Sequence, residues 1–522
     1  MVRKKALSGW ILPAILLACA GLAGVLGGQV HAQNSVGQDI RAFANVYSLV
    51  EANAATVPTP DKAIYDGAIP GMLRTLDPHS TFFDPKAYKL LREDQEGHYS
   101  GVGMQVTPRN DQTVVMWPFP GSPAYRAGIR PGDVISFVND KSTQGLTTTE
   151  VADMLKGPRN SKVKITVSRE GAKDYLSFTV IRQDINRPTV TGFWIKPGYA
   201  YVKIASFGET TSHELEDTLR NLGEDRVKGL VLDLRGNPGG LLTEAVAVCD
   251  HFLRRGQVVV SQHGRSSPER VYRAAHGNHG HDYPIVVVVN QSSASAAEIV
   301  SGALQDHDRG WILGETTFGK GLVQTVIPLP DETALALTTA HFYTPSGRLI
   351  QRDYSHISFY DYYSHKDGAH NDMKDVKTTD SGRKVYGGGG ITPDETFKPT
   401  PFDSLEVQLY RKGLFDFSRQ YFAAHPDQQF TSGWMPDDAM LKQLRDYLHS
   451  NGYKFEDSDF QKDNEWIKRY LAKEMYISGV NVDESNRIFE ATDPEVTAAV
   501  AAMPKAEALL DRAHKVMAER VR

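Results

Sequence analysis

Ser295 has the sequence setting of a nucleophile. It follows an apolar run that ends at Asn290 and precedes a helical pattern that begins near Ala296. A side chain at such a strand-to-helix junction lies at the end of a sheet, where the first N–H groups of the helix are unpaired and suit an oxyanion. The alternative is that Ser292, Ser293 and Ser295 are only turn and N-cap residues, the common role of serine there.

Lys320 is the best placed base for this serine. It lies between Gly319 and Gly321, in a predicted turn that can approach other backbone closely. A lysine accepts a proton only when it is neutral, so burial must lower its pKa from an ordinary value of about 10.4. Gln324, four residues further on, carries an amide that can orient a neutral amine without adding charge. These residue types predict nucleophilic catalysis of acyl transfer.

Other reactive residue types carry weaker signals. His307 follows Ser295 by 12 residues on the same predicted helix, about 18 Å away at the helical rise, which makes it a poor base. The G-x-S-x-G elbow of α/β-hydrolases is absent. The histidines of "HGNHGH" lack an acidic partner at a fixed spacing, so we expect a loop and no metal site. The remaining acidic and basic candidates are expected to cap helices or to fix the glycine-rich loop: Glu298, Asp306, Asp308, Asp233 and Arg235.

The elements that must position these residues alternate between strand and helix over residues 199–344. The apolar runs at 230–234 and 285–289 are short and do not alternate with polar residues, which is typical of strands buried on both faces. The pattern predicts an α/β core with crossover helices.

The flanking regions differ in pattern. Residues 40–91 place apolar side chains at helical spacing, broken by "DPHSTFFDP". Short strands with glycine and proline punctuation follow, with one clear helix in "TTEVADMLKG". Residues 352–386 are polar and tyrosine-rich without a period, which predicts a long loop or insertion. The chain after Phe402 reads as amphipathic helices.

Composition and the first residues restrict the class of protein. The chain has 522 residues, 40% of them hydrophobic, and a net charge of −5, which gives no electrostatic case for nucleic acid. Residues 1–32 combine a basic start, an apolar run and small residues, which predicts a secretory signal peptide cut after Ala32. Two alternatives remain open: a retained membrane anchor, or a lipoprotein modified at Cys19. Without that segment Cys249 would be the only cysteine, which excludes an internal disulfide.

Several separated motifs resemble the carboxyl-terminal processing peptidases, a family of serine endopeptidases. The resemblance covers roughly residues 40–400, and the motifs occur in the order of the family. They are "TLDPHSTFFDP" (75–85), "GVGMQV" (101–106), "DLRGNPGG" (233–240), "SASAAEIVSGALQDHDR" (293–309), "GETTFGKGLVQ" (314–324), "YTPSGRLIQ" (343–351) and "GGGITPD" (388–394).

This resemblance implies roles for single residues. The nucleophile of the family falls on Ser295, its base on Lys320 and its lysine-orienting glutamine on Gln324. The oxyanion donors of the family are backbone N–H groups, which fall on Ala296 and on Gly239 or Gly240. The resemblance implies no metal and no organic cofactor.

The module before the core resembles a PDZ domain. "SGVGM" is similar to the loop that binds a peptide carboxylate, which puts peptide-binding backbone at Gly101, Val102, Gly103 and Met104. "GSPAYRAGIRPGDVI" is the second PDZ-type signature. The alternative is a purely structural glycine turn. Lys156 and Arg159 follow the predicted groove helix, where solvated surface charge is the expected role for each.

The resemblance implies a multidomain α/β architecture. Its protease core is a crotonase/ClpP-like βα superhelix with an inserted PDZ domain. The expected regions are a signal peptide or membrane anchor (1–32), an N-terminal helical region (33–98), a PDZ domain (99–185), a protease core with an insertion at 352–386 (186–400) and a C-terminal helical extension (401–522).

The function implied is that of a periplasmic serine endopeptidase for exported polypeptides with nonpolar or flexible C-termini. The resemblance also implies cell-wall hydrolases as substrates and a helical-repeat lipoprotein adaptor, and a homo-oligomer is a reasonable expectation. Two alternatives remain: a catalytically silent PDZ-containing binding protein with a peptidase-like core, and an acyl-transfer or hydratase-type enzyme.

Overall fold

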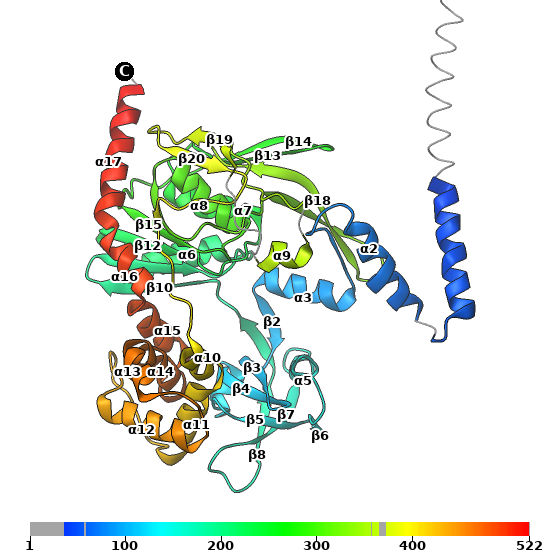
Figure 1. Ribbon diagram of the computed structural model, residues 1–522, viewed down its shortest axis with the longest axis vertical. Helices are drawn as coiled ribbons and strands as arrows, with labels where there is room; N and C mark the ends of the chain where they lie inside the picture. The colour runs from blue at the N-terminus through cyan, green and yellow to red at the C-terminus, as the bar shows by residue number, and fades with distance from the viewer. Residues whose placement is uncertain (1–35, 57–58, 356–357, 365–371, 521–522) are drawn as a thin grey trace, which may run out of the picture. The chain divides into compact units, whose positions relative to one another are not determined.

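The computed structural model describes residues 36–520 except 57–58, 356–357 and 365–371 (Figure 1). The predicted signal peptide, with its anchor and lipoprotein alternatives, lies outside the described residues. Among the residues that are described, no helix is long and apolar enough to cross a membrane. The chain divides after Leu76 into two compact units.

The first unit is helical where it is described. Residues 36–53 form a helix, followed by a π-helix, η1 (Lys62–Ala68), and by α2 (Ile69–Leu73). Apolar side chains of the first helix are exposed: Val36, Ile40, Phe43, Val46 and Leu49. The helical expectation for this stretch agrees with the structure.

A six-stranded sheet forms the centre of the second unit. Its strand order is β10-β11-β12-β15-β16-β21, antiparallel between β10 and β11 and parallel elsewhere. Every residue of β12 and β15 is buried, which explains their unalternating apolar sequences. The strands are β10 (Val190–Lys196), β11 (Tyr199–Ile204), β12 (Gly229–Asp233), β15 (Ile285–Val289), β16 (Gly310–Gly314) and β21 (Glu395–Thr396).

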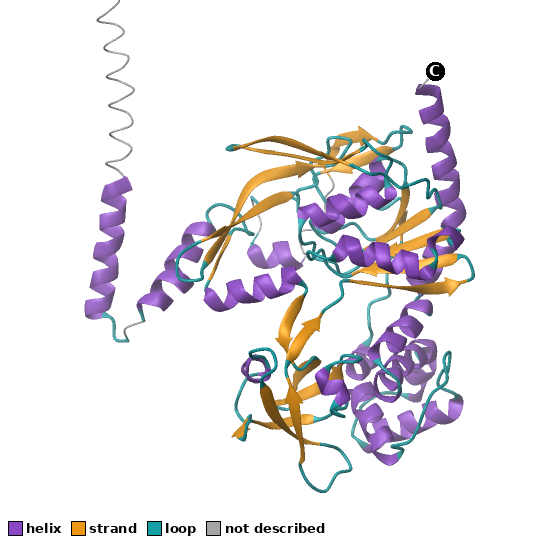
Figure 2. Cartoon of the chain, turned by 180° about the vertical axis from the view of Figure 1, so that it is seen from behind, coloured by secondary structure: helices purple, strands orange, loops and turns teal. Residues whose placement is uncertain are grey.

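Helices cover both faces of this sheet (Figure 2). On one face, Leu230 and Leu232 of β12 pack in a core with α6 (Thr211–Leu222), α7 (Leu242–Phe252) and α8 (Ala296–Asp306). On the other face, Val231 packs with α16 (Pro494–Ala501) and α17 (Met503–Arg520). The last two helices of the predicted C-terminal extension therefore form a layer of the core.

An antiparallel sheet adjoins the core. Its order is β1-β18-β13-β14, with β17 also paired to β18. The strands are β1 (Thr81–Phe83), β13 (Val258–Gly264), β14 (Ser267–Arg273), β17 (Leu322–Pro328) and β18 (Ala334–Tyr343). The stretch "DPHSTFFDP", which interrupts the helical pattern of the sequence, contains strand β1, and β1 pairs with β18.

The inserted module forms its own sheet and core. The strand order is β3-β4-β5-β7-β8, with β6 on β5, and the paired strands β2 and β9 bring its two ends together. Its elements are β2 (His98–Gly101), β3 (Met104–Arg109), β4 (Gln112–Pro118), α4 (Pro123–Arg126), β5 (Val134–Val138), β6 (Lys141–Ser142), α5 (Thr148–Leu155), β7 (Lys162–Ser168), β8 (Leu176–Ile181) and β9 (Gln183–Asn186).

The remaining elements flank these parts. The stretch expected to be a long loop contains α9 (Phe359–Ser364) and a hairpin of β19 (Asp372–Thr378) and β20 (Lys384–Gly387). A helical bundle precedes α16. The other helices are α3 (Pro85–Glu96), η2 (Glu224–Arg226), α10 (Ser404–Gln408), η3 (Leu409–Gly413), α11 (Leu414–Ala424), α12 (Asp438–Ser450), α13 (Asp457–Lys462), α14 (Asn464–Gly479) and α15 (Val482–Ala491).

Candidate active site

Ser295 occupies a strained turn between β15 and α8. Its backbone has φ 54° and ψ −112°, a conformation that residues with a side chain rarely adopt. Its N–H donates to Glu298 Oε2 at 2.8 Å. Backbone strain that the surrounding structure maintains is typical of functional positions, and a nucleophilic serine on a strand-to-helix turn is one such case.

The glycine-rich turn lies against this serine at Gly239. A β-carbon added to Gly239 would lie 2.7 Å from Ser295 Cβ and 3.0 Å from the nitrogen of Ala296, so only glycine permits this approach. The N–H of Gly239 donates to Asn237 Oδ1 at 2.8 Å. Within the described chain, no acceptor is recorded for the N–H groups of Ala296 and Gly240. The arrangement therefore favours Ala296 and Gly240 as donors to an oxyanion and gives Gly239 the role of close packing.

Lys320 lies in the turn before β17 with a neutral partner. Its Nζ donates to Gln324 Oε1 at 2.6 Å, and Gln324 Nε2 in turn donates to the carbonyl oxygen of His79. Burial lowers the pKa of Lys320, although the more distant carboxylates of Glu298 and Asp77 raise it in part. An amide partner leaves that lowering in place, because it contributes no charge. Lys320 therefore loses its proton at a lower pH than an ordinary lysine, because its pKa is lowered.

Glu298 joins the nucleophile and the base through their backbones. Its Oε2 accepts from the N–H of Ser295 at 2.8 Å and from the N–H of Lys320 at 2.9 Å. Its Oε1 accepts from the N–H of Gly319 at 2.7 Å and from Thr317 Oγ1 at 2.5 Å. Burial raises the pKa of this carboxyl, although the four hydrogen bonds lower it in part.

The expectation for Glu298 was a helix cap, and the structure adds a second role. Sequence reasoning missed that it also binds the turn of Lys320, 22 residues further along the chain. The S-x-x-E spacing from Ser295 to Glu298 was the available signal, since it is the pattern of a capping box.

The backbones of Ser295 and Lys320 share the acceptor Glu298, but their side chains are not hydrogen-bonded to each other. Across the residues that the structure describes, no hydrogen bond joins Ser295 Oγ to Lys320 Nζ. In enzymes without substrate, catalytic hydrogen bonds are often long and shorten in the complex.

An aromatic cluster surrounds His79, whose carbonyl oxygen accepts from Gln324. The rings of Phe318 and Tyr362 meet edge to face at 5.4 Å. Tyr362 OH lies 3.0 Å from His79 Nε2, and burial together with the charge of Lys320 lowers the pKa of His79 to about 4. Tyr362 belongs to α9, so the insertion at 352–386 contributes to this aromatic cluster.

The predicted carboxylate-binding loop, Gly101–Met104, joins β2 to β3. Gly103 has φ 77°, and a β-carbon there would lie 2.5 Å from Ser122 Cβ. Ser122 Oγ donates to the carbonyl oxygen of Gly103 at 2.7 Å and so holds the loop. The helix α5 contacts β3, as the two walls of a peptide groove must.

The two basic residues after α5 differ from each other. Lys156 Nζ lies 2.5 Å from Glu93 of α3, and its side chain is only 27% exposed. It is therefore part of an ion pair with the preceding helix, where solvated charge was expected. Arg159 is 67% exposed and pairs with Asp184 at 2.9 Å, which agrees with a surface role.

His307 and His276 have their partners outside the candidate dyad. His307 Nδ1 lies 2.7 Å from Asp380 Oδ2, and its Nε2 lies 2.7 Å from the carbonyl oxygen of Val258. His276 pairs with Asp250 at 2.8 Å. Among the described residues, no group of three or more histidine, cysteine, aspartate or glutamate residues could hold a metal ion.

Comparison with known proteins adds family relationships. The sequence model of peptidase family S41 matches residues 198–356, and a PDZ domain model matches residues 114–169. A carboxy-terminal-processing protease of Bartonella bacilliformis is 38% identical over 323 residues, which are 61% of this chain and 74% of the relative. The carboxy-terminal processing protease CtpA of Bacillus subtilis is 36% identical over 295 residues, 56% of this chain and 63% of the relative.

One solved structure is also similar in sequence. The photosystem II D1 C-terminal processing protease is 30% identical and covers 69% of this chain and 89% of its own, with a TM-score of 0.35. The family relationship therefore rests on the sequence relatives and not on the superposition of the structures.

Proposed function

Since this chain belongs to peptidase family S41 and is a serine protease with a PDZ domain, we propose that it hydrolyses peptide bonds by a serine–lysine mechanism. Ser295 Oγ attacks the carbonyl carbon of the scissile bond, and the neutral amine of Lys320 takes the hydroxyl proton. The N–H groups of Ala296 and Gly240 stabilise the oxyanion. Lys320 then gives its proton to the leaving amine, and water hydrolyses the acyl-enzyme.

One observation carries this proposal: the buried carboxylate of Glu298 binds the backbones of both Ser295 and Lys320. A turn that had only a structural role would not need a partly buried lysine beside it. The pairing of Lys320 with the neutral amide of Gln324 supports the same mechanism, because a carboxylate partner would keep the lysine charged.

The PDZ module gives the proposal a substrate class. A PDZ groove binds a peptide C-terminus as an added strand, with its carboxylate on loop N–H groups. The loop Gly101–Met104 and the helix α5 support this use here. We therefore propose polypeptide substrates with nonpolar or flexible C-terminal tails.

The proposed location and partners rest on the sequence and on the family resemblance. The basic and apolar start of the sequence supports export to the periplasm, either free or anchored to the membrane. Cell-wall hydrolases as substrates, a helical-repeat lipoprotein adaptor and self-association follow from the family resemblance alone.

Cleavage of an unfolded reporter with a nonpolar tail tests the mechanism. Purified residues 33–522 are compared with the Ser295→Ala and Lys320→Ala variants, with melting temperature and tail-peptide binding as controls. We expect both variants to lose cleavage while folding and binding persist. Undiminished cleavage by Ser295→Ala would contradict the mechanism. Tight peptide binding without cleavage by the wild type would favour the silent binding protein.

A further inference from the structure

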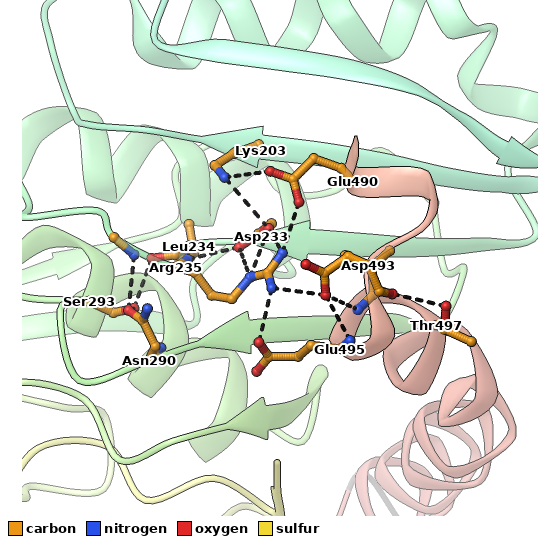
Figure 3. A network of polar contacts seen from close by, with 12 residues as sticks. Lys203, Asp233, Leu234, Arg235, Asn290, Ser293, Glu490, Asp493, Glu495 and Thr497 are labelled. Atoms are coloured by element: carbon orange, nitrogen blue, oxygen red, sulfur yellow. Dashed lines mark hydrogen bonds and ion pairs between the residues drawn. The ribbon is translucent and has the colours of Figure 1, made fainter. Parts of the chain in front are cut away.

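The C-terminal helices reach the loop that carries the candidate oxyanion donor. Glu490 near the end of α15, Asp493 at the N-cap of α16 and Glu495 in its first turn converge on Arg235 (Figure 3). Arg235 lies two residues after the end of β12 and begins the "RGNPGG" turn. Residues about 255 positions apart in the sequence therefore form one network.

The guanidinium of Arg235 is fully engaged. Nε donates to Asp233 Oδ1 at 3.0 Å, and Nη2 donates to Asp233 Oδ2 at 2.6 Å and to Glu490 Oε2 at 3.1 Å. Nη1 donates to Glu495 Oε2 at 2.9 Å and to Asp493 Oδ1 at 3.3 Å. Every recorded partner of Nη1 thus comes from the C-terminal helices. The carboxylates of the C-terminal helices therefore bind Nη1 and Nη2 of the guanidinium. Asp233 binds its Nε and Nη2.

The network continues from Arg235 to the nucleophile. Gly236 N–H donates to Asn290 Oδ1 at 3.0 Å, and Ala294 N–H donates to the carbonyl oxygen of Asn237 at 2.9 Å. Figure 3 shows Asn290 and Ser293 beside the turn. The oxyanion turn and the turn before Ser295 are therefore joined at two points, so a shift of Arg235 would move both.

The charges of the cluster do not cancel. Besides Arg235, the cluster contains two cations: Lys203 pairs with Glu490 at 2.9 Å, and Arg469 pairs with Asp493. These three cations face four carboxylates, those of Asp233, Glu490, Asp493 and Glu495. Burial, with a contribution from the nearby carboxylates, raises the pKa of Glu495 to about 7, although Arg235 lowers it in part. Within the described chain Glu495 Oε1 has no hydrogen-bond partner. Glu495 is therefore a buried carboxylate with one oxygen on Arg235 and the other without a partner among the described residues.

We propose that Glu490 and Glu495 are positioning residues of this peptidase. Their carboxylates hold Arg235, and Arg235 holds the turn whose Gly240 N–H stabilises the oxyanion. The inference rests on the proposed serine–lysine mechanism and extends its site to the C-terminal helices. Positioned donors stabilise a transition state only while their geometry is fixed, so loosening the turn lowers kcat without weakening substrate capture by the PDZ module.

The test is the full chain carrying Glu490→Gln and Glu495→Gln together, assayed at about pH 8, where Glu495 is ionised. These changes keep side-chain size and remove two charges. The matched control is Glu484→Gln, which removes a carboxylate of the same α15 that pairs with Arg487 at 2.6 Å. We expect kcat to fall about tenfold in the double variant, with KM within about twofold, and the control to match the wild type.

A second readout does not depend on activity. Amide hydrogen exchange of residues 236–241 is expected to be about tenfold faster in the double variant than in the Glu484→Gln control. Unchanged kcat and unchanged exchange, or a lower melting temperature alone, would overturn the inference. If the wild type does not cleave the reporter, the serine–lysine mechanism fails, and the exchange rates still decide whether the carboxylates hold the turn.

Discussion

At the scale of single residues, the environment of Lys320 decides whether this site can work. Burial lowers the pKa of the lysine, and the partner of its Nζ is an uncharged amide. That amide is oriented by the carbonyl oxygen of His79, which comes from a segment 245 residues earlier. Two groups without negative charge, the amide of Gln324 and the carbonyl oxygen of His79, therefore hold the base.

Replacing Gln324 by glutamate is expected to disable the base. A carboxylate at hydrogen-bond distance stabilises the ammonium form and raises the pKa of Lys320. We expect kcat/KM near neutral pH to fall about 100-fold and the activity profile to move to higher pH. A pH–rate profile from about pH 6 to 10 checks this. An unchanged profile would show that Lys320 is not the base.

Glu298 offers a test of the backbone bridge. In Glu298→Gln, the amide nitrogen cannot accept a hydrogen bond, so the N–H groups on one side lose their acceptor. We expect a loss of about 2–4 kcal/mol in the free energy of unfolding and a larger relative loss of kcat than of substrate affinity. Urea unfolding and steady-state kinetics measure the two effects.

Glu244→Gln is the matched control for that variant. Glu244 also accepts from a backbone N–H, that of Ser212 at 2.9 Å, away from the dyad. Equal kinetic effects of the two substitutions would argue against a specific role for Glu298.

At the scale of elements, two turns at the carboxyl edge of the central sheet carry the chemistry. One follows β12 and the other follows β15, and these strands are parallel neighbours. Polar residues that follow adjacent parallel strands meet at the same edge. The glycine-rich turn therefore lies against Ser295 as a consequence of strand order.

Gly239→Ala is expected to abolish cleavage. Its β-carbon would lie 2.7 Å from Ser295 Cβ, at φ 101°. Gly236→Ala is the control in the same turn, since its φ is also positive while no atom lies within 4 Å of the added carbon. We expect the control to keep most activity at a stability cost of about 1 kcal/mol. Similar losses in both variants would trace the effect to backbone strain alone.

Glu495 in the first turn of α16 predicts a dependence of stability on pH. Glu495 has a pKa of 4.5 as an ordinary carboxyl and about 7 in the fold, so the folded protein binds this proton more tightly. Its contribution to the free energy of unfolding is present below about pH 4.5 and is lost as the pH rises through about 7.

Comparison with Glu495→Gln isolates this contribution. Between about pH 5 and pH 8, we expect the wild type to lose on the order of 1–3 kcal/mol relative to the variant. Chemical unfolding at both pH values measures the difference. A difference that does not change with pH would contradict the assigned pKa shift.

At the scale of the whole molecule, the described parts of the second unit differ in how they are attached. The PDZ module has its own core, and its two ends are adjacent through β2 and β9. The helices α16 and α17 instead share a core with the central sheet. The module is therefore separable and the last helices are not.

Two deletions test this difference. Replacing residues 102–182 by a two-residue Asn-Gly turn closes β2 and β9 into a hairpin, because Gly101 pairs with Gln183. We expect a folded core whose cleavage no longer depends on the substrate tail. Solubility, circular dichroism and cleavage of tailed and tailless reporters check this.

Removing residues 494–522 is expected to unfold the core. It exposes Val231, Val286, Val288 and Leu313, whose burial contributes together about 6–12 kcal/mol, comparable with a typical total stability of about 5–15 kcal/mol. A folded truncated protein would contradict the two-sided covering of the sheet.

The sequence by itself determined the residue types of the site and the local elements around them. The spacing of Ser295, Lys320 and Gln324, the unalternating strands and the helix after the serine are all local features. Local patterns report them because the strand period and the helix period express burial directly along the chain. The change from a module of short strands to an α/β core is predictable for the same reason, whereas the resemblance of its two motifs identifies the module as a PDZ domain.

Only the tertiary structure decided which groups complete the site. The bridge of Glu298 to Lys320, the carbonyl oxygen of His79 on Gln324 and the carboxylates of α15 and α16 on Arg235 join residues 22 to 260 positions apart. Such contacts depend on the order in which strands pair and on the helices that cover the sheet. No local period encodes that order, so the physical basis of the site appears only when the sheet is assembled.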